Sequence, residues 1–113
     1  AAGAVAEARG ALAALGPASA DADDRPRRSL EGEVRLALGD ALSAGGHPGE
    51  ARSEWIETVS LLQPLAGDGR DPRLLAPLAQ ALLGLGRRDE ALPVIDRLRA
   101  GGYRRAPFAD PVR

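Results

Sequence analysis

The sequence predicts an all-α fold of about five helices, arranged as antiparallel helix pairs. Apolar residues recur three and four places apart in successive segments, which is the spacing of one helix face. Clusters of glycine and proline separate these segments, as expected for turns. Two of the clusters, around Gly46 and Gly86, have similar residue types around them at a constant offset of 86 − 46 = 40. The two hairpins are therefore expected to be copies of one unit.

Size and composition limit the classes of function. The 113 residues are enough for one domain, residues 1–113, with a modest core. Aromatic residues make up only 3%, so alanine and leucine must fill the interior. The net charge of −1 argues against nucleic acid and membranes as partners, and without cysteine there is no disulfide or thiolate chemistry. No apolar run approaches the ~18 residues of a membrane span. The composition is typical of a bacterial high-GC genome, and it leaves the compartment open, with the cytoplasm slightly favoured.

The first two segments are predicted to be a helix and a linker. The apolar positions of residues 3–16 follow a helical spacing, at Val5, Ala8, Leu12 and Leu15. Gly16-Pro17 ends this helix. Residues 17–28 are polar and aperiodic, which predicts a linker. Their three aspartates superficially resemble a calcium loop, but the central glycine and closing glutamate are missing, so no metal is expected there.

Residues 29–64 form the first predicted pair. Ser29 can cap its first helix, and Gly45-Gly46 end that helix before Pro48 begins the second one. Pro64 is expected at the end of the second helix. The side chains expected to face inward are Leu30, Val34, Ala37, Leu38, Ala41 and Leu42, followed by Ala51, Trp55, Ile56, Val59 and Leu62.

Residues 72–100 form the second predicted pair, after a turn-rich loop at 65–71. Asp71 is suited to cap the helix that Pro72 begins, whereas Pro77 predicts a kink or a late start. Residues 101–113 are expected to form an extended tail whose two aromatic side chains fold back as a cap, Tyr103 and Phe108. The side chains expected to be buried in this pair are Leu74, Leu75, Leu78, Ala79, Leu82, Leu85, Ala91, Val94, Ile95 and Leu98.

The aligned positions resemble the tetratricopeptide-repeat family, whose units are antiparallel helix pairs of about 34 residues. A small residue on the first helix lets the second helix pack closely, and a large apolar residue on the second fills the gap to the next pair. Residues 3–16 align with the helix before Pro64 at an offset of 64 − 17 = 47, as half a repeat. The residues that show the resemblance are Leu38-Gly39, Leu42, Gly46, Ala51, Trp55 and Pro64, then Leu78, Leu82, Gly86, Ala91 and Ile95.

The resemblance implies a short right-handed solenoid with a groove lined by the first helix of each pair. Both offsets exceed the family period because the loops at 17–28 and 65–71 are long. Repeat units bury their faces only against neighbours, so the chain is expected to be the C-terminal piece of a longer array. In this groove a peptide or helix of a partner protein is expected to meet Glu33, Asp40, Ser43, Arg73, Gln80 and Leu83.

The residues that could carry chemistry have simpler interpretations. His47 is the single histidine, and it lies in a turn without a spaced acid partner, so an exposed or capping role is expected. Trp55 is expected in the core rather than stacked on a ligand. The carboxylates that follow His47 are expected on a solvated helix face: Glu50, Glu54 and Glu57. Two basic pairs are not expected to form a nucleic-acid site, because the domain as a whole is not basic: Arg87-Arg88 and Arg104-Arg105. We expect no enzymatic activity, cofactor or metal.

Two functions remain open from the sequence. The first is a protein–protein interaction scaffold that binds a peptide or helix in its groove. The alternative is a helical accessory domain that positions the parts of a larger bacterial enzyme, kinase or transcriptional regulator. Both need the same helix pairs, so the residues alone do not separate them.

Overall fold

The structure is a computed structural model that describes residues 2–15, 25–69 and 71–100. These residues form five α-helices and no strand, which confirms the all-α prediction. Residues 17–24 of the predicted linker and the predicted cap of Tyr103 and Phe108 lie outside the described residues, as does Arg104-Arg105. The helices are α1 (Ala2–Leu15), α2 (Arg25–Ala44), α3 (Pro48–Ala66), α4 (Pro72–Gly84) and α5 (Arg88–Ala100).

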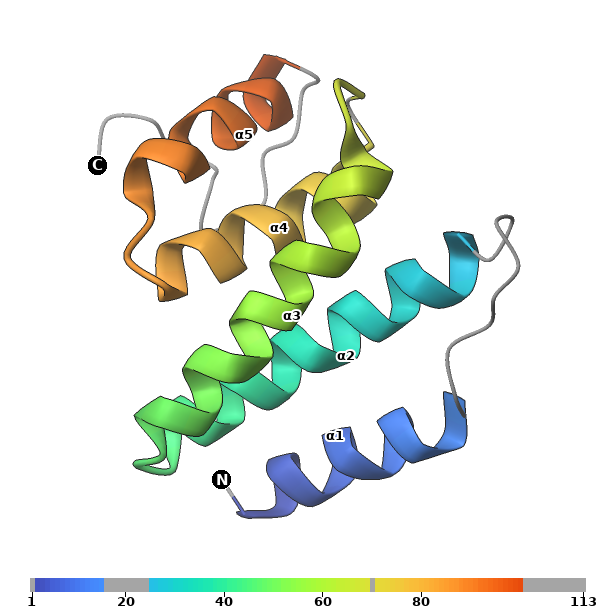
Figure 1. Cartoon of the computed structure of the whole chain (residues 1–113), viewed down its shortest axis with the longest axis vertical. Coiled ribbons are helices and arrows are strands. Elements are labelled where there is room, and N and C mark those ends of the chain that lie inside the picture. The colour runs from blue at the N-terminus through green and yellow to red at the C-terminus, as the bar shows by residue number, and fades with distance from the viewer. Residues whose placement is uncertain (1, 16–24, 70, 101–113) are drawn as a thin grey trace.

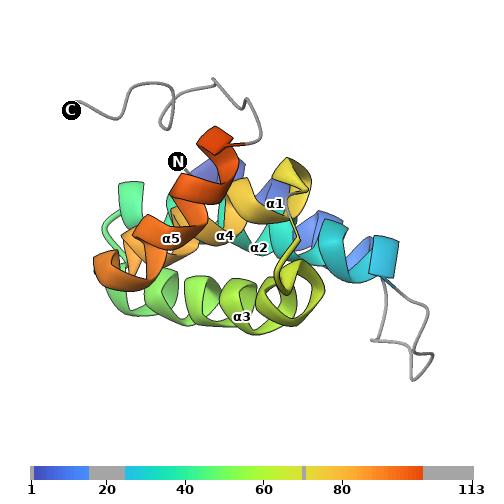
Figure 2. The ribbon, with the colours of Figure 1, turned by 90° about the horizontal axis from the view of Figure 1, so that it is seen from above.

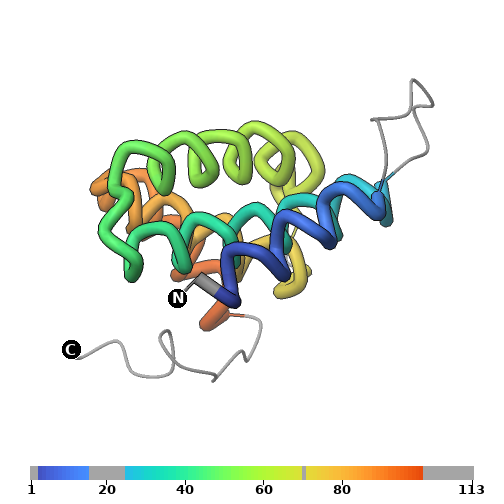
Figure 3. The backbone as a smooth tube through the Cα atoms, turned by 90° about the horizontal axis from the view of Figure 1, so that it is seen from below, coloured from blue at the N-terminus to red at the C-terminus, as the bar shows by residue number. Residues whose placement is uncertain are grey.

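The helices form two antiparallel hairpins and one added helix. In Figure 1, α2 and α3 make the first hairpin and α4 and α5 the second, while α1 runs antiparallel to α2. Helix α4 contacts both α2 and α3, so the hairpins are stacked through the first helix of the second one. Figure 2 shows α3 along one side of the molecule. Figure 3 shows α2 between α1 and α3.

The two tight turns share their backbone hydrogen bonds at an offset of forty residues. Gly46 and Gly86 have φ values of 85° and 77°, in the left-handed region that glycine tolerates at a helix end. The residue after each glycine donates its N–H back to the helix, His47 to the Leu42 oxygen at 2.8 Å and Arg87 to the Leu82 oxygen at 2.9 Å. Because 47 − 42 and 87 − 82 are both 5, the two turns close with the same backbone hydrogen bond at aligned positions.

Alanine in place of either turn glycine should lower the free energy of unfolding by about 1–2 kcal/mol, because the left-handed conformation strains any residue with a Cβ atom. A Cβ at Gly46 or Gly86 would meet no atom within 4 Å, so backbone strain is the whole cost and the two losses should be alike. Gly49→Ala is the control, since it lies in a helix without positive φ and should be neutral or stabilising. Urea denaturation of the three variants measures this, and clearly unequal losses at Gly46 and Gly86 would contradict equivalent turns.

Two groups of buried side chains hold the helices together, and Trp55 packs against both. Aligned positions are buried alike, since Ala51 and Ala91 are both fully buried. The main cluster joins α2, α3, α4 and α5 through Leu36, Val59, Leu62, Ala66, Leu75, Leu78, Ala79, Ala81, Leu82, Leu85, Ala91, Val94 and Leu98. The minor cluster joins α1 to the first hairpin through Ala8, Leu38, Leu42 and Ala51.

Trp55 lies where the two hairpins meet. A Cβ atom at Gly39 of α2 would approach its ring to 2.6 Å, and one at Gly84 of α4 would approach it to 2.9 Å. The indole Nε1–H donates to Asp40 Oδ1 at 3.0 Å, which fixes the plane of the half-buried ring. Ile95, the aligned residue of α5, is also half-buried and packs against the main cluster. Trp55 therefore fills the gap between neighbouring pairs, as its position in the alignment predicts.

Two predicted helix boundaries are wrong. Helix α2 begins at Arg25, four residues before the predicted cap Ser29, because a proline in the first turn loses no needed hydrogen bond and Arg27 Nη1 bonds Glu31 Oε1 at 3.1 Å one turn on. Helix α3 continues past Pro64 to Ala66. Helix α4 starts at Pro72, directly after the predicted cap Asp71, so the alternative of a late start at Pro77 is wrong.

The predicted inward faces are too wide. Leu30 is 47% exposed and Ile56 is 43% exposed, and Ala37 is exposed as well, although all three were expected to be buried. Helical spacing identifies an apolar stripe but not how much of it a neighbouring helix covers. The exposed Leu30 turns out to line a cleft between the hairpins.

Candidate functional site

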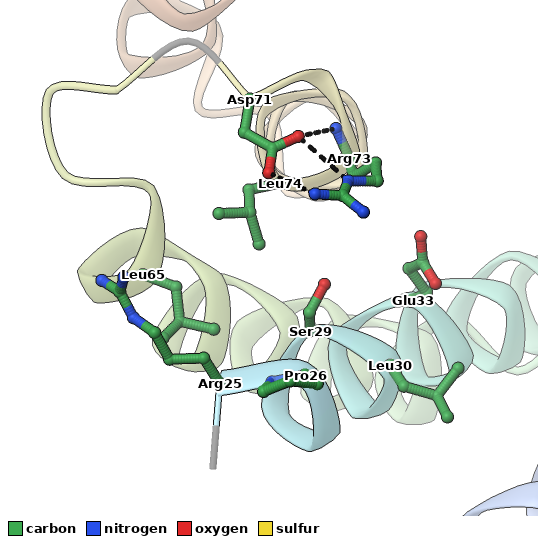
Figure 4. Close-up of a pocket in the computed structure, with 9 residues that line it drawn as sticks. All are labelled: Arg25, Pro26, Ser29, Leu30, Glu33, Leu65, Asp71, Arg73 and Leu74. Carbon is green, nitrogen blue, oxygen red and sulfur yellow. Dashed lines mark hydrogen bonds and ion pairs between the residues drawn. The ribbon is translucent and has the colours of Figure 1, made fainter. Parts of the chain in front are cut away.

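Two of the six residues expected in a groove, Glu33 and Arg73, line one cleft between the hairpins (Figure 4). The cleft lies where the first turns of α2 face the last turn of α3 and the first turn of α4, and it encloses about 390 Å³. Figure 4 shows Glu33 and Arg73 facing each other from α2 and α4. The lining residues are Arg25, Pro26, Ser29, Leu30, Glu33, Leu65, Asp71, Arg73 and Leu74.

Asp71 builds one wall of the cleft by capping α4. Its Oδ1 accepts from the backbone N–H of Arg73 at 3.0 Å, which satisfies a donor that the first helical turn leaves free. The Arg73 guanidinium folds back on the same carboxylate, with Nε and Nη2 each 3.3 Å from an oxygen. These hydrogen bonds lower the pKa of Asp71 below its usual range. The predicted cap is confirmed, and it also directs the arginine.

Asp71→Ala should lower the free energy of unfolding by about 1 kcal/mol at pH 7, the usual cost of losing a helix cap. Since the folded pKa of Asp71 is lowered, its contribution is complete above the unfolded pKa near 3.9 and is lost as the pH falls through the folded value. The gap between the wild type and Asp71→Ala, measured by urea denaturation, should therefore shrink below pH 4. Asp68→Ala, in the exposed loop before the cap, should change little at either pH. A gap that stays constant down to pH 2 would contradict the cap.

The floor of the cleft is apolar and its rim is charged. Leu65 and Leu74 are half-buried between the hairpins, and Leu30, which is nearly half exposed, lines the α2 side and points away from α4 in Figure 4. On the rim, the bond to Asp71 raises the pKa of Arg73, and the nearby Glu33 carboxylate adds to the effect. A cleft with this lining can bind the apolar side chains of a ligand, and its charged rim can pair with charged groups next to them.

The other four predicted groove residues do not line this cleft. Burial raises the pKa of Asp40, although the hydrogen bond from Trp55 opposes the shift. Asp40 therefore positions the ring at the junction of the hairpins. Ser43 is exposed and Gln80 is half-buried, while Leu83 is 38% exposed on α4. They continue the α2 and α4 faces beyond the cleft, toward the two turns.

The residues considered for catalysis are placed mostly as expected. His47 is exposed in the first turn, with Nδ1 3.6 Å from Glu50 Oε2, and it makes no side-chain cap bond. The prediction that Glu50, Glu54 and Glu57 all lie on a solvated face is wrong for Glu54. Its Oε1 accepts a hydrogen bond from Arg35 Nη1 of α2 at 2.9 Å, which links the two helices of the first hairpin. Arg87 pairs with Glu90 within the second turn.

Other features of the described residues bring no further site chemistry. A second hollow of about 450 Å³ lies between α1 and the first turn, lined by Val5, Ala6, Arg9, Leu42, Gly45, His47 and Glu50. No group of three or more histidine, cysteine or acidic side chains is placed to hold a metal ion in residues 2–15, 25–69 and 71–100. Across the same residues, every helix is too short or too polar to span a membrane.

Sequence reasoning missed most of the cleft. Arg25 was assigned to a linker, Leu30 and Leu74 to the core, and Leu65 to a loop. The one available signal was the capping pair Asp71-Pro72, which marks where α4 begins and therefore where its first turn opens toward α2. Comparison of the chain with protein-family models, with curated proteins and with solved structures found no match.

Proposed function

We propose that this chain is a helical-repeat interaction module, with tetratricopeptide-like pairs stacked as a short right-handed solenoid. The first helices of its pairs, α2 and α4, bind a segment of a partner protein. The equal turns at Gly46 and Gly86 support the repeat, and the contacts of α4 with both α2 and α3 support the stacking. Each unit of such an array adds surface to one continuous face.

The observation that carries this function is the cleft between α2 and α4. It joins residues forty places apart, since Glu33 and Arg73 occupy aligned positions on the two first helices, 73 − 33 = 40. Its leucine floor offers apolar area, at roughly 25 cal/mol for each Å² that a partner covers. Its charged rim supplies orientation. Both features are typical of surfaces that hold peptides with modest affinity.

Site-specific crosslinking tests the binding role in cells. A photoreactive phenylalanine analogue in place of Leu30 should crosslink the chain to a discrete partner, because Leu30 lines the cleft and is 47% exposed. The matched control is the same analogue in place of Ile56, which is equally exposed on α3 but does not line the cleft. Crosslinked bands of the same size and yield at both positions, or none at Leu30, would contradict a partner site in the cleft.

A further inference from the structure

The cleft between α2 and α4 carries two charges of opposite sign that its own residues leave without a bonded partner. Asp71 and Arg73 are bonded to each other, as the dashed lines of Figure 4 show. Arg25 and Glu33 line the same cleft on α2, and within the described part of the chain neither makes a hydrogen bond or an ion pair. An incoming segment therefore meets one positive and one negative group that form no hydrogen bond or ion pair, although Glu33 lies near enough to Arg73 to raise the pKa of that guanidinium.

The spacing of these charges sets the spacing of their partners. Arg25 and Glu33 are 33 − 25 = 8 residues apart on one helix, which is about 12 Å at a rise of 1.5 Å per residue. An extended peptide advances about 3.3 Å per residue, so residues four places apart are separated by about 13 Å. In an extended segment the residues i, i+2 and i+4 also face the same side. Three successive side chains on that side would reach Arg25, the leucine floor and Glu33.

The spacing of the charges suits an extended segment. Five extended residues cover the roughly 12 Å between Arg25 and Glu33, and alternate side chains of such a segment face the same side. Ser29, half-buried midway between the two charges, offers a hydroxyl that can bond the backbone of a segment lying along α2.

We propose that the cleft selects extended peptide segments in which an acidic and a basic side chain, four residues apart, flank an apolar side chain. The carboxylate pairs with Arg25, the basic group with Glu33, and the apolar side chain packs against Leu65 and Leu74. This inference rests on the proposed function and specifies the partner of that same site. Charge complementarity provides the selection, and apolar burial provides most of the affinity.

Fluorescence anisotropy with three labelled synthetic peptides tests the charge rule on the full chain. The probes are Gly-Glu-Thr-Leu-Thr-Lys-Gly and its relatives with two glutamates or two lysines in place of the mixed pair. The wild type should bind the mixed peptide about fivefold more tightly than either relative, the size that exposed ion pairs reach at low salt. Arg25→Glu should shift the preference to the dibasic peptide, and Glu33→Lys should shift it to the diacidic one.

Controls and outcomes separate this inference from the proposed function. Arg52→Glu and Glu57→Lys make the same charge changes on the exposed face of α3 and should leave the preference unchanged. Equal binding of all three peptides that Leu74→Asp abolishes would overturn the charge rule while the cleft remains a peptide site. Binding of none of the peptides would overturn the charge rule, and failed crosslinking at Leu30 as well would overturn the proposed function.

Discussion

Replacing Leu82 by alanine should lower the free energy of unfolding by about 3 kcal/mol, within the range for fully buried leucines. Leu82 is 0% exposed in the main cluster, and its carbonyl oxygen accepts the Arg87 N–H that closes the second turn. Alanine leaves that bond intact and removes only apolar contacts.

The adjacent Leu83 provides the matched control for this prediction. It lies in the same helix and is 38% exposed, so Leu83→Ala should cost well under 1 kcal/mol. Thermal unfolding followed by circular dichroism measures both variants, and Leu82→Ala should lower Tm by roughly 15 °C. Similar losses at the two positions would show that the buried face of α4 has been assigned wrongly.

Replacing Trp55 by alanine should also cost about 3 kcal/mol, although the ring is only half-buried, because it belongs to both clusters. The ring lies against Gly39 of α2 and Gly84 of α4, so its loss would leave a void at the junction of the hairpins. Trp55→Phe keeps part of this packing and loses the bond to Asp40, so it should cost less. Urea denaturation of both variants distinguishes ring packing from the hydrogen bond.

Ile56→Ala is the control for Trp55, since Ile56 is the next residue of α3 and is 43% exposed. This variant should change the free energy of unfolding by less than about 0.5 kcal/mol. If Trp55→Ala were no more destabilising than this neighbour, the ring would not join the hairpins. The stacking proposed for the two pairs would then lack its main contact.

The hairpins could be predicted from the sequence because their determinants are local. The glycine that ends a helix and the alanine five places later lie close together in the chain. The two turns also form the same backbone hydrogen bonds. The cap at Asp71 was also predictable, since it needs only its own carboxylate and the N–H of Arg73. The aligned residues Ala51 and Ala91 are both fully buried, as the sequence alignment predicts.

The boundaries and the cleft could not be predicted in the same way. The start of α2 at Arg25 depends on a side-chain bond between Arg27 and Glu31 and on a proline that fits its first turn. The exposure of Leu30 depends on which neighbouring helices cover α2, which no periodicity within α2 reports. A cleft between hairpins is formed by tertiary packing. The sequence shows which of its residues are polar or apolar, but it does not show that they lie together.

The contacts of the Trp55 ring test the central claim, that equivalent hairpins stack through α4, most directly. The chain has one tryptophan, so its indole resonances can be assigned without ambiguity in a nuclear Overhauser spectrum. We predict cross-peaks from the ring to the Hα atoms of both Gly39 and Gly84, since both residues lie against it. Cross-peaks to Gly39 without any to Gly84 would leave the first hairpin intact and contradict the stacking of the second one on it.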